Sequence, residues 1–283
     1  MSSLMTWLLK VEKQAHIVYR DCSEYFSHDA ELSEFLKLLS NDELGHYTIM
    51  EKVLSSGMSA EAISVELSDD FTERFDNNLK KLYVSIEKGS LQADELLKDI
   101  IEAELSEWNE LFVFSVKQYA KSDISRQVDI SMMQRHIDRI TIFLERSGKY
   151  PELISRLAML QKVWDYHILI VDDEAGIRDL LAMVFGRQFR VVCASDGCEA
   201  IELMKRSYFD MIISDVDMPC KNGEMMYHDA VQNDEQLRER IIYMTGAESH
   251  VPFFKKYGLR YFMKPFKIDL MRQMVYETIV DRR

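Results

Sequence analysis

The sequence predicts two domains: an all-helical N-terminal domain that forms a four-helix bundle, and a C-terminal α/β domain built on a parallel sheet. Residues 1–147 contain no proline, and their apolar residues recur at the spacing of helices. Beyond residue 166, short apolar runs alternate with helical patterns, which is typical of a parallel sheet. A length of 283 residues also suits about two domains.

The helical part divides at a recognisable break. We expect helices over about 3–26, 29–55, 91–121 and 126–147, with a less regular helical stretch over about 59–88. Gly148 suits the end of a helix, and Pro151 suits the start of the next one. We therefore place the helical domain at 1–148, a linker with a short helix (about 152–163) at 149–165, and the α/β domain at 166–283.

The α/β part contains five apolar runs of the length of buried parallel strands. We expect the strands at 167–171, 190–194, 210–214, 240–244 and 259–263. Helical patterns between them predict a doubly wound, five-stranded parallel sheet.

Polar side chains follow four of these strands. They are Asp172 and Asp173 after the first strand, Asp215 after the third, Thr245 after the fourth and Lys264 after the fifth. In an open α/β sheet, ligands bind at the carboxyl ends of the strands, so these side chains should converge on one pocket. Clustered carboxylates repel one another unless a cation lies among them, and hard oxygen ligands suit Mg²⁺.

This set of motifs, in this order, resembles the receiver domain of two-component response regulators, over roughly residues 166–283. The resemblance implies a flavodoxin-like fold in which Asp215 accepts a phosphoryl group from a histidine kinase. It implies that Asp172, Asp173, Asp215 and the backbone carbonyl of Asp217 hold Mg²⁺. Positioning and charge neutralisation are what phosphoryl transfer needs most.

The same resemblance implies the remaining roles. Thr245 would hydrogen-bond the bound phosphoryl group, and Lys264, followed by a cis Pro265, would pair with it. Tyr261 would change rotamer as Thr245 moves inward, which is the switch of that family. Only thirteen residues separate Thr245 from Leu259, which is short for a helix with its loops.

The helical domain carries carboxylates and histidines on its apolar stripes. They are Glu12 on the first helix, Glu43 and His46 on the second, Glu104 and Glu107 on the third, and His136 on the fourth. Burying several unpaired carboxylates in one bundle is costly unless something neutralises them, and metal ions would do so.

These residues give the helical domain a resemblance to ferritin-like, rubrerythrin-type four-helix bundles. That architecture takes one Glu from each of two helices and a Glu-x-x-His from each of the other two. Glu43 and His46 match one such pair, but Met133 stands where the fourth helix would supply a glutamate. The resemblance implies iron, held as an asymmetric pair, as a single ion, or lost from a scaffold kept for protein contacts. A solvated Glu43–His46 pair remains the plainer alternative.

Composition excludes several function classes. The net charge of −13 argues against non-specific nucleic-acid binding, and no apolar run is long enough to cross a bilayer. The N-terminus lacks the basic start and cleavage site of a signal peptide. Cys22, Cys193, Cys198 and Cys220 have no CxxC spacing, so we expect reduced thiols in a cytoplasmic protein.

We therefore expect a response regulator that is phosphorylated on Asp215 by a sensor histidine kinase or phosphotransfer protein, and that controls its helical domain or that domain's protein partners. It would need no enzymatic activity beyond its own phosphorylation and dephosphorylation. The alternatives are a receiver-gated di-iron oxidoreductase and an iron or oxygen sensor. A phosphotransfer bundle that uses His46 or His136 is a further reading, and pairing of two bundles would give a homodimer.

Overall fold

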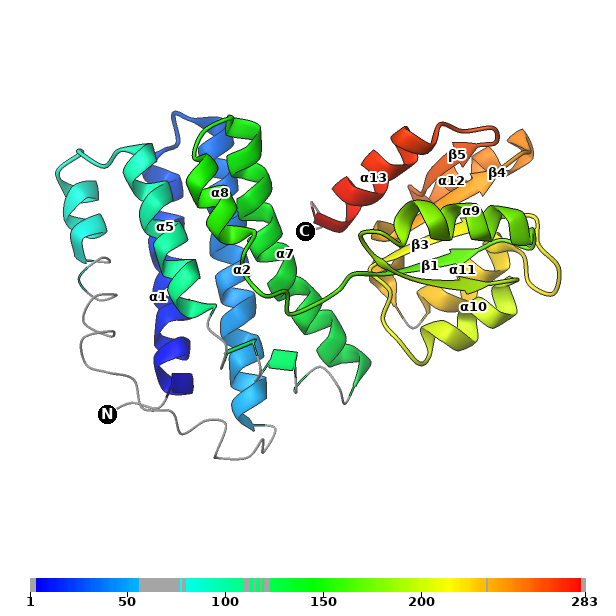
Figure 1. The fold of residues 1–283 in the computed structure, drawn as a ribbon, viewed down its shortest axis with the longest axis horizontal. Helices are drawn as coiled ribbons and strands as arrows, with labels where there is room; N and C mark the ends of the chain where they lie inside the picture. The colour runs from blue at the N-terminus through cyan, green and yellow to red at the C-terminus, as the bar shows by residue number, and fades with distance from the viewer. Residues whose placement is uncertain are drawn as a thin grey trace. The chain divides into compact units, whose positions relative to one another are not determined.

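The structure, a computed structural model, describes residues 4–55, 77, 80–108, 112–113, 116–117, 119, 123–232 and 234–280 (Figure 1). Its contacts divide the chain into two compact units. The first comprises residues 1–122 and 132–163, and the second comprises residues 123–131 and 164–283.

The first unit is helical. Its labelled helices are α1 (Leu4–Tyr25), α2 (Ala30–Ser55), α5 (Ala93–Glu107), α7 (Ile124–Ser147, whose first residues are counted in the second unit) and α8 (Pro151–Leu157). Asp29 begins α2, because its carboxylate accepts a hydrogen bond from the backbone N–H of Leu32 at 3.1 Å. The expected helices over 3–26, 29–55 and 126–147 are confirmed.

The core of this unit forms where the apolar stripes of the helices meet. Leu36, Leu39 and Ile101 are fully buried in it, and the stacked rings of Phe35 and Phe143 join α2 to α7 with centroids 3.8 Å apart. Buried hydroxyls also tie α1 to α2, since Ser33 Oγ donates to the carbonyl of Ser23 and Ser40 Oγ to that of His16, each at 2.8 Å. Each buried hydroxyl is therefore satisfied.

Two predicted helices are shorter than expected. α5 ends at Glu107, because Trp108 leaves the helical conformation and its indole N–H donates to the carbonyl of Gln161 at 2.9 Å. The linker helix α8 ends at Leu157 instead of residue 163, because the backbone beyond it pairs elsewhere: Val163 N donates to Gln134 Oε1 at 3.0 Å. These tertiary hydrogen bonds compete with continued helix.

Other expected helical stretches are described only in part. Residues 80–87 are helical, and the earlier part of the predicted stretch over 59–88 lies almost entirely outside the described residues. Beyond Trp108, the predicted third helix is described only at 112–113, 116–117 and 119, which are helical.

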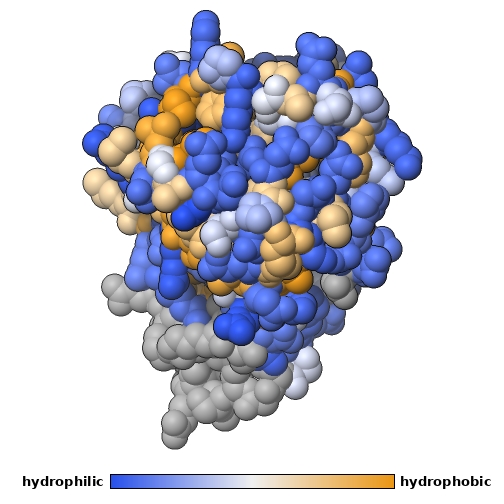
Figure 2. Space-filling model, turned by 90° about the vertical axis from the view of Figure 1, so that its right-hand side faces the viewer, coloured by the Kyte–Doolittle hydropathy of each residue, from blue (hydrophilic) through white to orange (hydrophobic). Residues whose placement is uncertain are grey.

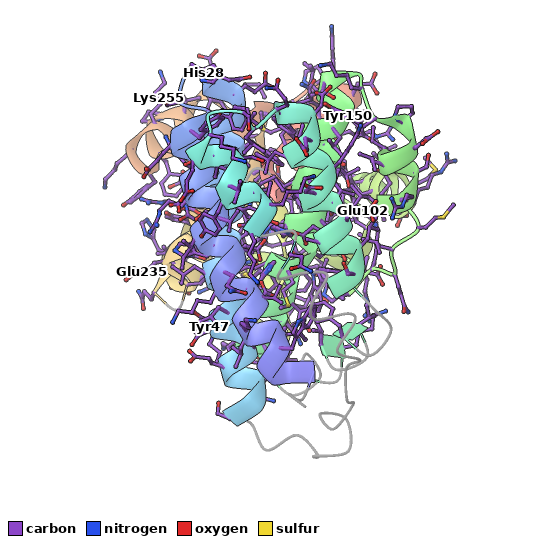
Figure 3. The ribbon with its side chains drawn as sticks, turned by 90° about the vertical axis from the view of Figure 1, so that its left-hand side faces the viewer. His28, Tyr47, Glu102, Tyr150, Glu235 and Lys255 are labelled. Carbon is purple, nitrogen blue, oxygen red and sulfur yellow. A yellow bond between two sulfur atoms is a disulfide. The ribbon has the colours of Figure 1, made fainter. Side chains whose placement is uncertain are left out.

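Paired polar side chains hold α8 and the residue before it against α5. Arg156 and Glu102 form two hydrogen bonds, one of them 3.0 Å long between Nη2 and Oε2. The Tyr150 hydroxyl donates to Asp94. Figure 3 labels Glu102 and Tyr150 on this side of the first unit.

The second unit contains a parallel five-stranded sheet in the order β2-β1-β3-β4-β5. The strands are β1 (His167–Val171), β2 (Arg190–Ala194), β3 (Met211–Asp215), β4 (Ile241–Thr245) and β5 (Arg260–Met263). All five predicted strands are confirmed, and three of them start one residue later than expected.

Helices cover both faces of this sheet. They are α9 (Ala175–Phe185), α10 (Gly197–Met204), α11 (Gly223–Val231), α12 (Val251–Tyr257) and α13 (Ile268–Val280), with short 3₁₀ helices η1 (Glu235–Glu239) and η2 (Glu248–His250). Figure 1 shows α9 and α13 on one face and α10 and α11 on the other. Burial on both faces explains the near-continuous apolar strands.

The connection from β4 to β5 is compact, as its length predicts. It holds η2 and the seven-residue helix α12, whose last residue, Tyr257, is followed by the capping residue Gly258. Gly258 has φ +65°, a left-handed conformation that glycine adopts without strain.

The surface of the second unit carries scattered hydrophobic side chains among hydrophilic ones (Figure 2). Exposed examples are Leu180, Met183, Met225, Leu270 and Tyr276. Among the described residues of the chain, no helix combines the length and the apolarity that a bilayer crossing requires.

Candidate functional site

The carboxyl ends of four neighbouring strands bring the predicted residues to one edge of the sheet. Asp215 and Thr245 are the last residues of β3 and β4, whereas Asp172 and Lys264 directly follow β1 and β5. Because β1, β3, β4 and β5 are adjacent and parallel, these side chains share the edge at which α/β sheets bind ligands.

Lys264 connects the two buried carboxylates of this edge. Its Nζ lies 2.7 Å from Oδ1 of Asp215 and 3.1 Å from Oδ2 of Asp172. Asp172 is fully buried and Asp215 is 6% exposed, so water solvates neither carboxylate well and their charges depend on a nearby cation. Asp172 Oδ1 also accepts the backbone N–H of Glu174 at 2.9 Å.

The charges of this cluster are incompletely balanced. Burial raises the pKa of Asp215 above its ordinary value, and the hydrogen bond and charge of Lys264 only partly offset that effect. Burial alone would lower the pKa of Lys264, but its hydrogen bond to Asp215 and the attraction of both carboxylates raise it. Two buried carboxylates that share one ammonium leave room for a further cation.

Lys264 is positioned by the backbone on both sides of it. Its N–H donates to the carbonyl of Thr245 at 2.7 Å, which extends the pairing of β4 with β5 by one bond. The Lys264–Pro265 peptide bond is cis, as expected.

Thr245 and the expected switch residue Tyr261 lie in separate surroundings. Thr245 is buried, and its Oγ1 accepts the backbone N–H of Ala247 at 3.1 Å, within its own loop. Tyr261 is half-buried, and its ring stacks on Phe254 of α12 with centroids 4.7 Å apart. Phe254 in turn stacks on the buried ring of Tyr243 at 5.2 Å.

Asp173 and Asp217 are more exposed than the other two acids. The Asp173 side chain is exposed, and its backbone carbonyl accepts a hydrogen bond from Arg178 at 3.0 Å. The Asp217 side chain lies 3.0 Å from Nε2 of His250. The structure therefore joins Asp172, Asp215 and Lys264 by direct contacts, and places Asp173 and Asp217 in the adjoining loops.

His250 is a residue to which the sequence assigned no role. Its Nδ1 lies 2.7 Å from Oε1 of Glu224 while its Nε2 faces Asp217, so it bridges the loops that follow β3 and β4. Burial would lower its pKa, but the two carboxylates outweigh that effect and raise it. The one sequence signal for its location near the site is that it lies five residues after Thr245, at the same edge of the sheet.

Gly223 allows a close approach beneath the site. A Cβ at this position would lie 2.7 Å from the carbonyl oxygen of Asp215 and 2.9 Å from Cε1 of Tyr243. The Tyr243 hydroxyl donates to the Gly223 carbonyl at 2.9 Å. The start of α11 is thus packed directly against the end of β3.

A second cluster lies inside the first unit. Its members are Glu12 of α1, Glu43 and His46 of α2, Glu104 of α5 and His136 of α7, and each is at most 5% exposed. The expectation that these side chains lie on buried stripes is confirmed. The side chain of Glu107, the sixth predicted member, lies outside the described residues.

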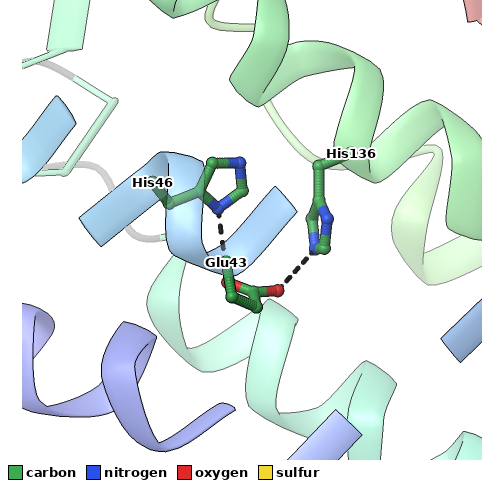
Figure 4. Close-up of side chains that lie close together, drawn as sticks. All are labelled: Glu43, His46 and His136. Carbon is green, nitrogen blue, oxygen red and sulfur yellow. Dashed lines mark ion pairs between the residues drawn. The ribbon is translucent and has the colours of Figure 1, made fainter. Parts of the chain in front are cut away.

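The two imidazoles contact the carboxylates of this cluster, and Figure 4 shows both of them paired with Glu43. His46 Nδ1 lies 3.3 Å from Oε2 of Glu43 and 3.5 Å from Oε2 of Glu12. His136 Nε2 lies 3.2 Å from Oε1 of Glu43 and 3.1 Å from Oε1 of Glu104. Glu43, His46 and His136 each offer one ligand atom within 4.8 Å of the others.

Asp42 fixes the orientation of His136. Its Oδ2 lies 3.3 Å from Nδ1 of the imidazole, and it also pairs with Arg139. Burial would raise the pKa of Asp42, but His136 and Arg139 lower it to about 2. Burial would likewise lower the pKa of His136, but Glu104 and Asp42 raise it to about 10.

The cysteines do not follow the sequence expectation. Cys198 and Cys220 form a disulfide, so the expectation of four reduced thiols is wrong for this pair. The two cysteines lie 22 residues apart in sequence, and only the fold brings their Cα atoms to 6.3 Å. Cys22 is a buried free thiol and Cys193 a half-buried one.

A parallel sheet with an acidic pair and a lysine at its strand ends defines a phosphoryl-accepting class of domain, and the comparisons agree. The family model of the response regulator receiver domain matches residues 168–276. Sporulation initiation phosphotransferase F of Bacillus subtilis is 33% identical over 110 residues, covering 38% of this chain and 89% of that protein. Chemotaxis protein CheY of the same organism is 30% identical, covering 40% of this chain and 98% of its own length.

Solved structures give similar matches. Response regulator protein TrrA from Thermotoga maritima, in complex with Mg(2+)-BeF, is 24% identical with a TM-score of 0.36, covering 40% of this chain and 98% of its own. The chain belongs to the response regulator receiver domain family through its second unit. The receiver domain implies a phosphoryl-accepting response regulator in two-component signalling, with a histidine kinase or phosphotransfer protein as its partner. The helical unit lies outside the matched residues.

Proposed function

We propose that Asp215 is the phosphoryl acceptor and that the phosphorylated receiver controls the helical unit or its protein partners. The contact of Lys264 with both Asp215 and Asp172 supports this assignment. In the transfer, a carboxylate oxygen of Asp215 forms a bond to phosphorus while the P–N bond of a phosphohistidine donor breaks. Water later cleaves the acyl phosphate and restores the carboxylate.

Asp172, Asp173, Asp215 and the backbone carbonyl of Asp217 would hold Mg²⁺. The fit rests on two buried carboxylates that share a single ammonium and on an all-oxygen donor set. The ion neutralises charge on the transferring phosphoryl group. Asp172, directly after β1, and Asp215, at the end of β3, would contribute carboxylate oxygens to such an ion.

Lys264 and Thr245 would act on the phosphoryl oxygens. Lys264 already contacts Asp215, so its ammonium can pair with a phosphoryl group formed there. Thr245 would turn its hydroxyl from Ala247 toward that group. The loop after β4 would move with Thr245, and the ring of Tyr261 would shift in response. Because Tyr261 stacks on Phe254, its movement would involve α12 directly.

The test is labelling of the full chain with a small phosphodonor in the presence of Mg²⁺. Asp215→Asn should abolish the label, because the substituted amide cannot form the acyl phosphate. Asp179→Asn, an exposed acid on α9, is the matched control and should label normally. Labelling that persists in Asp215→Asn would show that the acceptor is another residue.

A second candidate function concerns the cluster of the first unit. We propose that Glu12, Glu43, His46, Glu104 and His136, with Glu107 where it can reach, bind iron in a ferritin-like bundle. Three buried carboxylates with two imidazoles suit a transition metal, and such an ion would neutralise them. Among the side chains that the structure describes, none hydrogen-bonds the buried Nε2 of His46. Asp42 contacts Nδ1 of His136, as a carboxylate often contacts the far nitrogen of a metal-binding histidine.

The ligands of such a site would determine which reactions the bound iron could carry out. Bound iron would supply redox chemistry toward oxygen or peroxide, as an oxidoreductase or a sensor. Met133 is fully buried on α7, one turn before His136, and offers no carboxylate there. The donor set is therefore asymmetric.

Metal analysis of aerobically purified protein tests this second proposal. Stoichiometric iron that is lost in the double variant Glu43→Gln, His136→Asn, but retained in Glu51→Gln on the exposed end of α2, would support it. Protein that contains no iron, and whose thermal unfolding is unchanged by added Fe²⁺ or by chelator, would refute it. Labelling of Asp215 is unaffected by either result, so the two proposals are tested separately.

A further inference from the structure

The disulfide lies next to the loop that carries the proposed phosphorylation site. Cys220 stands five residues after Asp215 in the β3–α11 loop, and Cys198 is the second residue of α10. The cross-link therefore ties the loop that contains Asp217 to a helix on one face of the sheet. No part of the proposed phosphoryl chemistry uses these two cysteines.

The backbone holds the two segments together independently of the sulfur atoms. Gly197 N donates to the carbonyl of Lys221 at 3.1 Å. A Cβ on Gly197 would lie 2.5 Å from that carbonyl oxygen, so only glycine permits this approach. Reduction would leave the two thiols close together, and the disulfide could form again without rearrangement of the fold.

The start of α10 also fixes Cys198. The carboxylate of Asp196 caps the helix by accepting the N–H groups of Cys198 at 2.8 Å and Glu199 at 2.9 Å. Cys220 has φ +61°, a left-handed conformation that is unfavourable for a residue with a side chain. The cross-link helps to hold that conformation.

The pair contains the most accessible of the four cysteines. Cys220 is exposed and Cys198 half-buried. Burial raises the pKa of Cys22 to about 12 and raises the pKa of Cys193 as well, which lowers the thiolate fraction of both free cysteines. Once the pair is reduced, small disulfides should therefore reach Cys220 before the other cysteines.

The loop itself is short and tightly closed. Gly223 N donates to the carbonyl of Val216 at 2.9 Å, and Lys221 N donates to that of Pro219 at 2.7 Å. These hydrogen bonds close the loop around Asp217, which lies three residues before Cys220. The backbone of Asp217 carries the carbonyl assigned to Mg²⁺.

We propose that Cys198 and Cys220 form a reversible thiol–disulfide modification site that sets how tightly the receiver binds Mg²⁺. The disulfide restricts the β3–α11 loop to the conformation in which Asp217 is placed for the ion, so the oxidised receiver is preorganised. The reduced receiver must order this loop when it binds the ion. The effect on Mg²⁺ rests on the proposed function, whereas the modification itself does not.

The redox step is thiol–disulfide exchange with a small-molecule disulfide such as oxidised glutathione. The thiolate of one cysteine attacks the disulfide and releases one small thiol, which leaves a mixed disulfide on the protein. The second thiolate then displaces the remaining small thiol. One disulfide is broken and one is formed, and two electrons pass from the protein thiols to the small molecule.

The first measurement follows the modification on the folded full chain. The protein is equilibrated in glutathione buffers of graded potential, its free thiols are blocked, and its peptides are analysed by mass. We expect a reversible link between the peptides of Cys198 and Cys220, which reforms without unfolding. Thiols that remain free at every potential, or a link that appears only in denaturant, would overturn the proposal.

The second measurement follows Mg²⁺. Mg²⁺ binding without phosphodonor, and the Mg²⁺ midpoint of labelling with it, are compared between oxidised and reduced protein. We expect a tighter midpoint in the oxidised form by about fivefold, the lower end of typical coupling between sites. Cys198→Ser/Cys220→Ser should match the reduced protein in both buffers, while Cys193→Ser should keep the difference.

Equal midpoints in the two forms would overturn the control of Mg²⁺ binding by the disulfide. If neither the oxidised nor the reduced protein were labelled or bound Mg²⁺, the proposed function would be contradicted. The proposed control of Mg²⁺ binding by the disulfide would then fail with it. The peptide analysis decides the modification site in either case.

Discussion

The Nζ of Lys264 lies 2.7 Å from Oδ1 of Asp215, across the ends of two strands that are not neighbours in the sheet. β4, which ends in Thr245, lies between β3 and β5. The lysine side chain thus reaches across the end of β4. The hydroxyl of Thr245, the last residue of β4, is expected to move when Asp215 is phosphorylated. The ammonium of Lys264 contacts Asp215, the proposed acceptor, while the backbone N–H of Lys264 donates to the carbonyl of Thr245.

Removing this ammonium should destabilise the metal-free receiver. Lys264→Ala leaves Asp172 and Asp215 buried without their shared cation, which should cost about 1–3 kcal/mol in the free energy of unfolding. Urea unfolding in chelator measures the loss, and added Mg²⁺ should recover part of it. Lys255→Ala, on the exposed side of α12, should change neither value, and an equal loss in both variants would contradict the charge argument.

A side chain at position 223 should disturb the site from below. Gly223→Ala places a Cβ 2.7 Å from the Asp215 carbonyl oxygen and 3.0 Å from Cα of Val216, both of them backbone atoms that cannot move freely. We expect a loss of about 1–3 kcal/mol in stability. Gly176→Ala in α9 meets nothing within 4 Å and serves as the control in the same unfolding assay. A Gly223→Ala protein as stable as the control would show that this contact relaxes cheaply.

The stability of the second unit should fall on mild acidification, partly through His167. Burial lowers the pKa of His167 below its ordinary value of 6.5. The unfolded chain then binds this proton more readily than the folded one, so the contribution of His167 is complete above pH 6.5 and is lost below it. Urea midpoints between pH 7.5 and pH 5.5 should fall less steeply in His167→Gln than in wild type. Identical slopes in the two proteins would refute the effect.

Much of the second unit could be predicted from the sequence because its three central strands, β1, β3 and β4, are buried on both faces. Such strands appear as continuous apolar runs, and the first polar residue after each marks the ligand-binding edge. This placed Asp172, Asp215, Thr245 and Lys264 at one edge before any contact was known. The helical stripes likewise indicated that Glu43 and His136 are buried.

The features that could not be predicted depend on contacts between distant segments. The end of α8 at Leu157 follows from hydrogen bonds beyond it that involve Trp108 and Gln134. The Cys198–Cys220 pair exists because a glycine brings α10 against a loop. His250 gains its two carboxylate partners only when the loops after β3 and β4 meet. Periodicity and motifs carry no signal for such approaches.

The most direct measurement is the location of the phosphoryl group. The full chain is phosphorylated with a small phosphodonor and Mg²⁺, the acyl phosphate is trapped by borohydride reduction, and its peptides are sequenced by mass spectrometry. The account predicts one modified position, Asp215, in the oxidised and the reduced protein alike. A phosphoryl group found instead on His46 or His136 of the helical unit, or on another carboxylate, would contradict it.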